Sequence, residues 1–540
     1  MRAVSSNAFG LLIVCFLTFP EPLFPARSII NLDIVSPGVI GNYTASSINL
    51  SGPAFDVSIS RLRERFLAHF NISHTFLYNY SILNCVDFQN EVQNMLARWY
   101  YTVDRSESVT VIMTPGCIES AQLNELAATW NVLLISTANS APAIRDKAKS
   151  PSWVTTNLFP SSYYGEIFNQ LIVFHNWTSI DILLDRGSTG SYVLMFSLTI
   201  AVLENRKMRA TNRDYNSSSG EFEFPAFLQR VSTRNRILLF LGSPNELRKL
   251  LVAASWMNMT NGDYVYITGT SFIWKPYGDY SWKRRDPSDE IILQAYKSVI
   301  FVVMVDMEMS SSPISKSMQA SWRTRFEEDP FYQNTGLDTD PPLPMLTSAT
   351  GSLEILGEVL NETLAECPSS CNLRDGTTMA RKMMNRTFST TVGQVRFDAN
   401  GERRPFLSSA SYFDSTENRR KVYLRASTGQ KGEFKWKQVD SLSWHGGSQL
   451  PPSEPVCGFI EKGTACLNSG DTTRNALLGV LIPIILLVAG GVAVVVIKIR
   501  SRNHFWWQLD STSFGLQSAR SQSRSTVSPV SFISNFVHGC

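Results

Sequence analysis

The sequence lacks the short motifs on which common catalytic and metal sites are built. It contains no phosphate-binding Walker loop, no His-Glu-x-x-His pair and no Gly-x-Ser-x-Gly elbow. Its six histidines are scattered over 540 residues, so no metal site is expected. The chain also has little excess charge, since 18% of its residues are charged and the net charge is +3. This balance argues against nucleic acid as the main partner.

The amino-terminal segment predicts secretion. Met1 and Arg2 precede an apolar run from Phe9 to Phe19, which is too short to cross a bilayer comfortably. Three prolines end the run before any cluster of basic residues: Pro20, Pro22 and Pro25. We therefore interpret residues 1–27 as a signal peptide and exclude them from the fold.

A second apolar segment, residues 476–497, predicts a transmembrane helix. Ala476 to Ile497 contains no charged residue and, at about 1.5 Å per residue, covers the roughly 30 Å hydrocarbon layer. A buried core helix is the alternative, disfavoured at this length without a charge. Only Arg474 lies close on the amino-terminal side, whereas three basic residues follow the segment: Lys498, Arg500 and Arg502. The positive-inside bias therefore predicts a single-pass type I plasma-membrane protein with an extracellular amino terminus.

Residues 498–540 are expected to form a short cytoplasmic tail that is largely disordered. Ser and Arg dominate this segment, and Asp510 is its single acidic residue. A nucleotide cyclase needs a folded domain that holds metal-binding carboxylates and a nucleotide pocket. We therefore expect that the chain is not an enzyme in this form.

Glycosylation motifs of the type Asn-x-Ser/Thr occur only before the predicted span. Each motif alone is weak evidence, but the one-sided distribution supports a glycosylated extracellular region with these positions on its surface. The asparagines are Asn42, Asn49, Asn71, Asn79, Asn176, Asn216, Asn258, Asn361 and Asn385.

The cysteines follow the same division. Cys15 lies in the signal peptide and Cys540 in the tail, which leaves six in the oxidising compartment and suits three disulfides. Fifteen pairings of six cysteines exist on paper. Proximity in the sequence favours Cys85 with Cys117, Cys367 with Cys371, and Cys457 with Cys466. The middle pairing stays open because its short spacer closes a tight loop. A metal role for these two cysteines is disfavoured, since no nearby His or further Cys completes a tetrahedral site.

From the signal peptide to about residue 300, apolar β-branched runs alternate with segments of helical period. This alternation indicates βαβ units and a parallel sheet, that is, an α/β fold. We expect strands at residues 28–36, 110–113, 132–136, 179–184, 236–241, 264–268 and 299–304. Helices are expected at residues 61–69, 90–99, 120–130, 164–174 and 243–253. Pro151 and Pro160 interrupt the pattern near residues 150–162, which predicts two α/β lobes.

After residue 305 the pattern weakens into loops and lobe crossings, followed by a helix at residues 349–366. From Gly393 short alternating strands with turns at Asn400-Gly401 and residues 429–432 predict a hairpin-like sheet. Residues 446–475 are rich in Pro, Gly and Ser and are expected to form an extended juxtamembrane stalk. The ligand-binding ectodomain is thus assigned to residues 28–445.

Three ordered patches carry a resemblance to a known family. Thr114-Pro-Gly-Cys117 followed by residues 121–135 resembles the first-lobe signature of the receptor guanylate cyclases and natriuretic peptide receptors. Residues 393–403 ("GQVRFDANGER") resemble the second-lobe hairpin of that family, and residues 455–466 ("PVCGFIEKGTAC") its juxtamembrane disulfide loop. The nematode-type members are the closer comparison. The resemblance implies a two-lobed ectodomain of the periplasmic-binding-protein type I fold with three crossings between the lobes.

The resemblance also implies partners and a bound ion. Family members bind peptides between two protomers, so we expect an extracellular ligand, peptide or small molecule, and a homodimer, and we name no ligand-binding residue. Vertebrate relatives hold a chloride ion near the first disulfide, and Gly116 and Cys117 match that turn, although the matching Ser is not placed. The family continues into kinase-like and cyclase domains, which we do not expect here.

Two further segments have both a functional and an ordinary interpretation. Residues 274–285 ("WKPYGDYSWKRR") suit a ligand or dimer contact, but a solvated loop is the preferred interpretation. Ala489 and Ala493 give the span a small-residue face for a second copy, or are simply lipid-facing.

We interpret the protein as a non-catalytic receptor that acts in clearance, as a decoy or through its tail. A truncated product of a full receptor guanylate cyclase gene is one alternative. A non-signalling adhesion or structural surface glycoprotein is another.

Overall fold

The computed structural model of the protein describes residues 29–41, 45–82, 85–116, 119–138, 142–307, 316–333, 342–366, 372–428, 433–445, 449–455, 458–459 and 464–502. The chain separates into two compact units, Met1–Ile460 and Glu461–Cys540. The described part of the first unit is an α/β structure, and that of the second is one long helix. The α/β fold predicted from the alternating pattern is therefore confirmed.

The first lobe is built on a five-stranded parallel sheet of order β2-β1-β3-β4-β5. Parallel strands covered on both faces are rich in branched apolar residues, and β3 and β4 are buried along their whole length. The strands are β1 (Ile30–Pro37), β2 (Phe70–Leu77), β3 (Val109–Thr114), β4 (Leu133–Ser136) and β5 (Trp153–Thr155). The connecting helices are α1 (Ile48–Phe66), α2 (Cys85–Thr102), α3 (Ser120–Trp130) and the short η1 (Pro142–Arg145).

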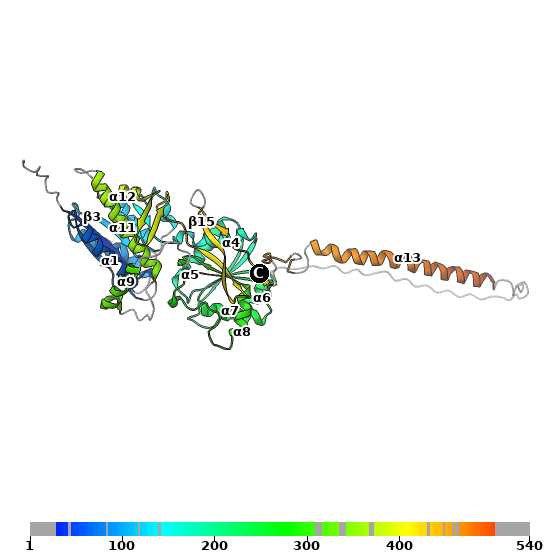
Figure 1. The fold of residues 1–540 in the computed structure, drawn as a ribbon. Coiled ribbons are helices and arrows are strands. Elements are labelled where there is room, and N and C mark those ends of the chain that lie inside the picture. The colour runs from blue at the N-terminus through cyan, green and yellow to red at the C-terminus, as the bar shows by residue number, and fades with distance from the viewer. Residues whose placement is uncertain are drawn as a thin grey trace, which may run out of the picture. The chain divides into compact units, whose positions relative to one another are not determined.

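A later part of the chain returns to complete this lobe. Helix α11 packs along α1, where a Cβ on Gly357 would lie 2.6 Å from the side chain of Leu62, so the two helices are in close contact. In Figure 1, α11 and α12 lie in the same lobe as α1 and β3. The added elements are α9 (Lys316–Glu328), α10 (Pro330–Gln333), α11 (Leu343–Glu366), α12 (Gly376–Met383), β11 (Thr387–Thr390), β12 (Gly393–Phe397) and β13 (Arg403–Arg404).

The second lobe contains an eight-stranded sheet of order β16-β15-β14-β10-β9-β8-β6-β7. The strands from β7 to β10 are parallel and those from β10 to β16 antiparallel. The strands are β6 (Ser179–Asp185), β7 (Arg209–Tyr215), β8 (Ile237–Leu241), β9 (Val265–Thr270), β10 (Val299–Val303), β14 (Ser409–Asp414), β15 (Arg419–Thr428) and β16 (Phe434–Gln438).

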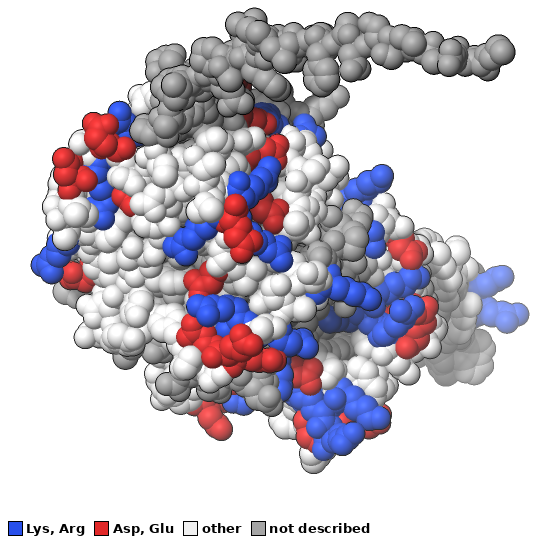
Figure 2. Space-filling model, turned by 60° about the vertical axis from the view of Figure 1, so that its left-hand side comes forward, with Lys and Arg blue, Asp and Glu red and all other residues white. Residues whose placement is uncertain are grey.

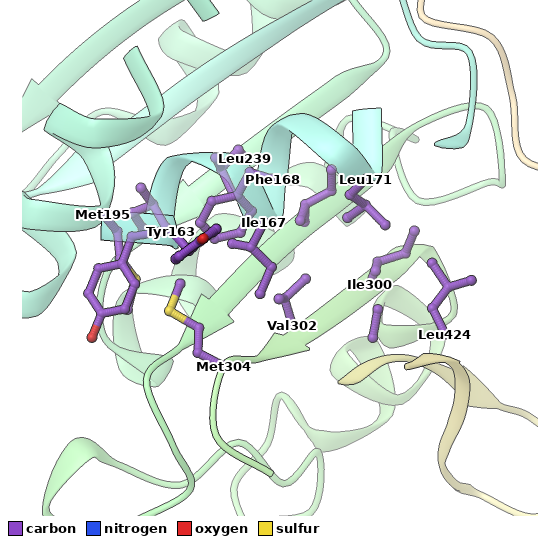
Figure 3. Packing of buried hydrophobic residues seen from close by; sticks show 14 of the residues in the cluster. Tyr163, Ile167, Phe168, Leu171, Met195, Leu239, Ile300, Val302, Met304 and Leu424 are labelled. Carbon is purple, nitrogen blue, oxygen red and sulfur yellow. The ribbon is translucent and has the colours of Figure 1, made fainter. Parts of the chain in front are cut away.

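Helices cover this second sheet. They are η2 (Ser161–Tyr163), α4 (Tyr164–Phe174), α5 (Gly190–Asn205), α6 (Phe224–Ser232), α7 (Pro244–Trp256), η3 (Lys275–Tyr277), α8 (Asp289–Ala295) and η4 (Tyr296–Ser298). Figure 3 shows Ile167 and Leu171 of α4 near Ile300 and Val302 of β10, and all four belong to one buried cluster. The apolar face of α4 thus closes one side of the sheet.

The chain passes between the lobes three times. It leaves lobe 1 after β5, returns after β10, and leaves again between β13 and β14. Two lobes and three crossings confirm what the proline break and the resemblance predict. On the face drawn in Figure 2, basic and acidic side chains lie next to one another rather than forming a patch of one sign.

Several expected boundaries differ from the observed ones. The helices at residues 120–130 and 164–174 have the expected bounds, whereas α1 begins at Ile48 rather than at Arg61. Gly52 and Pro53 read as helix breakers, yet a Cβ on Gly52 would lie 2.6 Å from the ring of Tyr332. The glycine therefore serves close packing inside the helix. Strand β2 and helix α5 were not expected at all.

The segment 274–285 is the solvated loop that the sequence favoured only in part, since its charged residues Lys275, Asp279, Lys283 and Arg285 are exposed whereas some of its aromatic residues pack against the lobe. Trp274 is 8% exposed and belongs to the core of the second lobe. The Tyr280 hydroxyl lies 2.7 Å from that of Tyr192, and Arg248 Nη1 donates a hydrogen bond to the carbonyl oxygen of Trp282 at 2.9 Å. These contacts hold the aromatic part of the segment against the lobe, which its abundance of charged residues does not reveal.

The second unit is helix α13 (Thr464–Arg502). Its part Leu477–Arg502 has a mean hydropathy of 3.1 and is long and apolar enough to cross a membrane. The helix begins inside the segment expected to be an extended stalk, so that expectation is wrong for Thr464 and beyond. The prolines of the expected stalk all precede Thr464, so no proline interrupts the helix between Thr464 and the apolar span.

Candidate functional site

A cavity of about 360 Å³ is lined by residues of both lobes. The described lining residues follow the carboxyl ends of β1, β4, β6, β9 and β10: Ser46, Ala138, Thr189, Ser271 and Val305. Ligands of open α/β sheets bind outside the carboxyl ends of the strands. A larger hollow of about 630 Å³ lies against α1 and β2, but its described lining residues belong to the first lobe alone.

One wall of the cavity is the turn from β6 into α5. The buried carboxylate of Asp185 accepts hydrogen bonds from Gly187 N at 2.9 Å and Ser188 Oγ at 2.6 Å. It also accepts from Ser217 N at 3.0 Å and Ser217 Oγ at 2.9 Å. These four bonds fix the turn, so that Thr189, Gly190 and Ser191 line the cavity. The Thr189 and Ser191 hydroxyl oxygens lie 2.7 Å apart.

Aromatic side chains form the wall on the side of the second lobe: Phe159, Tyr164, Phe272 and Tyr277. The rings of Phe159 and Tyr164 are stacked with centroids 5.9 Å apart. Burial raises the pKa of the Tyr164 hydroxyl, an effect that its interaction with Ser271 opposes. Burial also raises the pKa of Tyr277, and the backbone amide of Ala45 opposes that rise by hydrogen bonding to the phenol oxygen. This contact links the second lobe to the first.

The first lobe supplies small and apolar groups. Ala45, Ser46, Val86, Ala138 and Met345 line this side together with Cys85. The Ser46 hydroxyl donates to the carbonyl oxygen of Gly116. Ser46 thereby ties the start of α1 to the turn after β3. Both lobes thus contribute to the surface of one cavity.

Comparison with known proteins agrees with this arrangement of two lobes around a cavity. The family model described as "Receptor family ligand binding region" matches residues 52–407. The chain belongs to this receptor family. The matched range includes the aromatic wall, the β6–α5 turn and the first two lobe crossings, and it covers every described lining residue of the cavity except Ala45 and Ser46.

The relatives of this receptor-family chain include natriuretic peptide receptors and receptor guanylate cyclases. Atrial natriuretic peptide receptor 3 of Mus musculus is 22% identical over 391 residues, which cover 71% of this chain and 69% of that protein. Guanylate cyclase 2G of Rattus norvegicus is 21% identical over 488 residues, which cover 87% of this chain and 42% of that protein. Receptor-type guanylate cyclase gcy-28 of Caenorhabditis elegans is 23% identical over 295 residues, which cover 51% of this chain and 22% of that protein. The family expected from the sequence patches is confirmed.

Most of the predicted glycosylation positions lie on the surface of the receptor. Asn42 lies outside the described residues. Asn49 is a correction, because it is 6% exposed and its Oδ1 accepts a hydrogen bond from Gly41 N at 3.0 Å at the start of α1. The remaining asparagines are exposed: Asn71, Asn79, Asn176, Asn216, Asn258, Asn361 and Asn385. Glycosylation itself stays a prediction.

The predicted disulfides fall mostly outside the described part of the chain. Cys85 is disulfide-bonded at the start of α2, but Cys117 lies outside the described residues, as do Cys367, Cys371 and Cys457. Cys466 lies in α13, and nothing is described of its side chain. The three pairings, and the chloride near Gly116 and Cys117, therefore stay predictions. Among the described residues no group of three or more His, Cys, Asp or Glu side chains could hold a metal ion.

The sequence assigned no ligand-binding residue, although the segment 274–285, for which a ligand contact was the less favoured interpretation, contains the lining residue Tyr277. Ser188-Thr-Gly-Ser191 follows the correctly predicted strand at residues 179–184, and polar turns after parallel strands are common ligand sites. That signal could have pointed to Thr189 and Ser191. The aromatic wall could not be found in this way, because Phe159 and Tyr277 are far apart in the sequence.

Proposed function

We propose that the protein is a single-pass cell-surface receptor that binds an extracellular ligand in the cavity between its two lobes and is itself non-catalytic. The observation that carries this proposal is the origin of the cavity walls. Thr189 and Tyr277 come from the second lobe, whereas Ser46 and Met345 come from the first. A ligand that touches both walls stabilises the arrangement of the lobes in which the two walls face each other. The size of this stabilisation equals the difference between the ligand's binding free energies in the two arrangements.

The proposed topology is type I at the plasma membrane. All predicted glycosylation motifs precede the apolar part of α13, and Lys498, Arg500 and Arg502 follow or end it. Asymmetry of basic residues around a span places the basic side in the cytosol. The ligand-binding lobes then face the outside.

The ligand source and the partner copy belong to the proposal as well. One relative is named as a receptor for atrial natriuretic peptide, which makes a peptide the alternative to a small molecule.

A homodimer is supported by aromatic residues on α2 and α3. Tyr101 is 70% exposed, and Tyr100 stacks on Trp130 with centroids 4.0 Å apart. Exposed Tyr and Trp are common at the centre of interfaces. Chemical cross-linking of the full chain, with Tyr101→Glu as the weakened variant, tests the dimer.

Binding to cells tests the receptor function directly. Cells that display the full chain are incubated with labelled extracellular fluid, separated into a peptide pool and a small-molecule pool, with atrial natriuretic peptide as a defined peptide probe. Gly190→Phe adds a ring at a residue that lines the cavity, where a Cβ meets no atom within 4 Å. Ala201→Phe adds the same ring at an exposed position of the same helix.

Saturable binding that Gly190→Phe abolishes and Ala201→Phe preserves, at equal surface expression, supports the proposal. Equal binding to cells that display the native chain, Gly190→Phe or Ala201→Phe contradicts the proposal. The absence of saturable binding from every pool contradicts it as well. Production of cyclic GMP above that of untransfected cells contradicts the non-catalytic part.

A further inference from the structure

We infer that the ligand of the interlobe cavity is an uncharged, predominantly apolar small molecule that makes one or two hydrogen bonds to hydroxyl groups. This inference rests on the proposed function, since it assigns a chemical class to the same site. Three properties of the cavity carry it: the kind of side chain in its walls, the state of its polar groups and its size.

The described walls contain no side chain that carries a formal charge. Their residues are Ala, Ser, Cys, Val, Asn, Phe, Tyr, Thr, Gly, Leu and Met, with no Asp, Glu, Lys, Arg or His among them. A charged ligand loses its hydration on entering such a cavity and gains no opposite charge. Amino acids, phosphates and acidic or basic peptides are therefore disfavoured.

Two carboxylates adjacent in sequence to lining segments are engaged elsewhere. Asp306 follows the lining residue Val305, but its carboxylate accepts a hydrogen bond from Ser409 Oγ at 2.6 Å. Asp185 precedes the lining turn at Thr189, and its carboxylate accepts four hydrogen bonds, from Gly187, Ser188 and Ser217. Neither carboxylate is among the groups that line the cavity. These two carboxylates therefore bring no charge to the walls.

A polar contact is nevertheless available. Ser271 lines the cavity and is 9% exposed. A hydroxyl has one donor and two acceptor sites, so a ligand group can bond Ser271 in addition to its neighbour in the wall. The Tyr164 hydroxyl interacts with Ser271 and lies on the same wall. A neutral donor or acceptor on the ligand, such as a hydroxyl, carbonyl or amine N–H, fits this pair.

The cavity size excludes bulky ligands. Its volume of about 360 Å³ is near the lower end of the range of roughly 300–1,000 Å³ for small-molecule sites. Phe159, Phe272 and Tyr277 supply flat apolar surface for a ring or a compact aliphatic body. A folded peptide hormone does not fit in this volume, although a peptide could still bind elsewhere on the receptor.

Two fluorescent probes that differ by a single charged group test the inference. N-phenyl-1-naphthylamine is neutral, apolar and carries one N–H donor, and its 8-sulfonate has the same ring system with one negative charge. Each is titrated into the full chain in nanodiscs, and the signal of empty nanodiscs is subtracted. The variants are Gly190→Phe, which adds a ring at a residue lining the cavity, Ala201→Phe as the matched surface control, and Ser271→Ala.

The neutral probe is expected to bind saturably to the native chain and to Ala201→Phe. Gly190→Phe should weaken binding by at least about tenfold, because the ring occupies apolar contact area. Ser271→Ala should weaken it by about twofold to tenfold through the lost hydrogen bond. The sulfonate should bind the native chain at least about tenfold more weakly than the neutral probe.

Equal affinity for the two probes overturns the inference, as does neutral-probe binding that is insensitive to Gly190→Phe or is absent. These results are separable from the receptor test on cells. If a charged ligand from the pools binds saturably and depends on Gly190, the receptor function stands and the chemical class is wrong. If the neutral probe occupies the cavity but the cells bind nothing from any pool, the receptor function fails instead.

Discussion

The indole Nε1 of Trp177 donates a hydrogen bond to the carbonyl oxygen of Pro451 at 2.9 Å. Ser453 adds two more bonds, as its Oγ accepts from Thr178 N at 3.1 Å and its carbonyl oxygen from Arg236 N at 3.0 Å. Residues 449–455 therefore lie against the amino-terminal ends of β6 and β8, whereas the cavity lies at the carboxyl ends of the same sheet. The start of the predicted stalk is thus packed, which corrects its expected extended form.

Loss of the Trp177 donor should loosen this segment. Trp177→Phe keeps an aromatic ring and removes one hydrogen bond, which contributes about 1 kcal/mol. Hydrogen exchange of the full chain should accelerate in peptides that cover residues 449–455, with little change elsewhere. Trp256→Phe is the matched control, because Trp256 is 75% exposed. Unchanged exchange in Trp177→Phe would show that this bond does not hold the segment.

A buried ion network at the lobe crossings should dominate stability. Glu402 is 0% exposed and lies 3.1 Å from Arg145 Nε and 2.9 Å from Arg404 Nη2. Glu402→Gln removes the charge that pairs with Arg145 and one of the two carboxylates that pair with Arg404, the other being Asp398, which costs about 3–5 kcal/mol for a buried pair. Glu417→Gln, at an exposed pair with Arg419, should cost less than about 1 kcal/mol. Thermal unfolding of the full chain in nanodiscs compares the two; equal shifts would contradict the argument.

Two buried histidines predict loss of stability in acid. Burial is the main cause that lowers the pKa of His74 and of His175 to about 4 each, from the ordinary value of 6.5. Because these pKa values are lower in the folded chain, the unfolded chain binds more protons between about pH 4 and 6.5. The stabilisation is therefore complete above pH 6.5 and is lost as the pH falls.

The slope of the unfolding free energy measures this effect. Each histidine contributes up to about 1.4 kcal/mol per pH unit within that window. The double variant His74→Gln/His175→Gln should have a flatter pH dependence between pH 6.5 and 4 than the native chain, and each single variant an intermediate one. An unchanged slope in the double variant would rule these groups out as the cause.

Replacement by Ala should change the stability of the protein in opposite directions at two glycines. A Cβ on Gly165 of α4 would lie 2.2 Å from the carbonyl oxygen of Leu198 in α5, so the helices must separate. We expect Gly165→Ala to cost about 1–3 kcal/mol, as overpacking does. Gly190→Ala meets nothing within 4 Å and should be neutral or gain up to about 1 kcal/mol. Thermal unfolding of both variants checks the order, and similar values would contradict the close approach of α4 and α5.

Glycan occupancy should follow exposure. Mapping of glycopeptides from the full chain expressed in eukaryotic cells should find glycans among the exposed asparagines, for example Asn176 and Asn258, and none on Asn49. A glycan on Asn49 would displace the hydrogen bond with Gly41 and could not be accommodated in the buried start of α1. A fully occupied Asn49 in the folded receptor would contradict this placement.

Local patterns predicted the regular part of the fold well. The helix at residues 120–130 ends where Asn131 adopts a left-handed conformation with φ 52°, a helix-ending role that Asn fills readily. The start of α1 was missed because Gly52 and Pro53 are poor helix formers, and packing against Tyr332 outweighs that preference. Likewise the charges of residues 274–285 suggested solvent, and these charged side chains are exposed, whereas Arg248 and Tyr192 hold Trp282 and Tyr280 of the same segment against the lobe.

The sequence by itself determined the α/β class, the two lobes, the apolar span and the receptor family, because each depends on periodicity, composition or short ordered motifs. Only the tertiary structure decided where a ligand could bind. The cavity brings Ser46, Thr189 and Tyr277 together from separate strand ends of two lobes, and no local pattern encodes such a meeting. The burial of Asn49 and the packing of Pro451 against Trp177 were likewise decided by the tertiary structure, because they depend on how the surrounding chain folds.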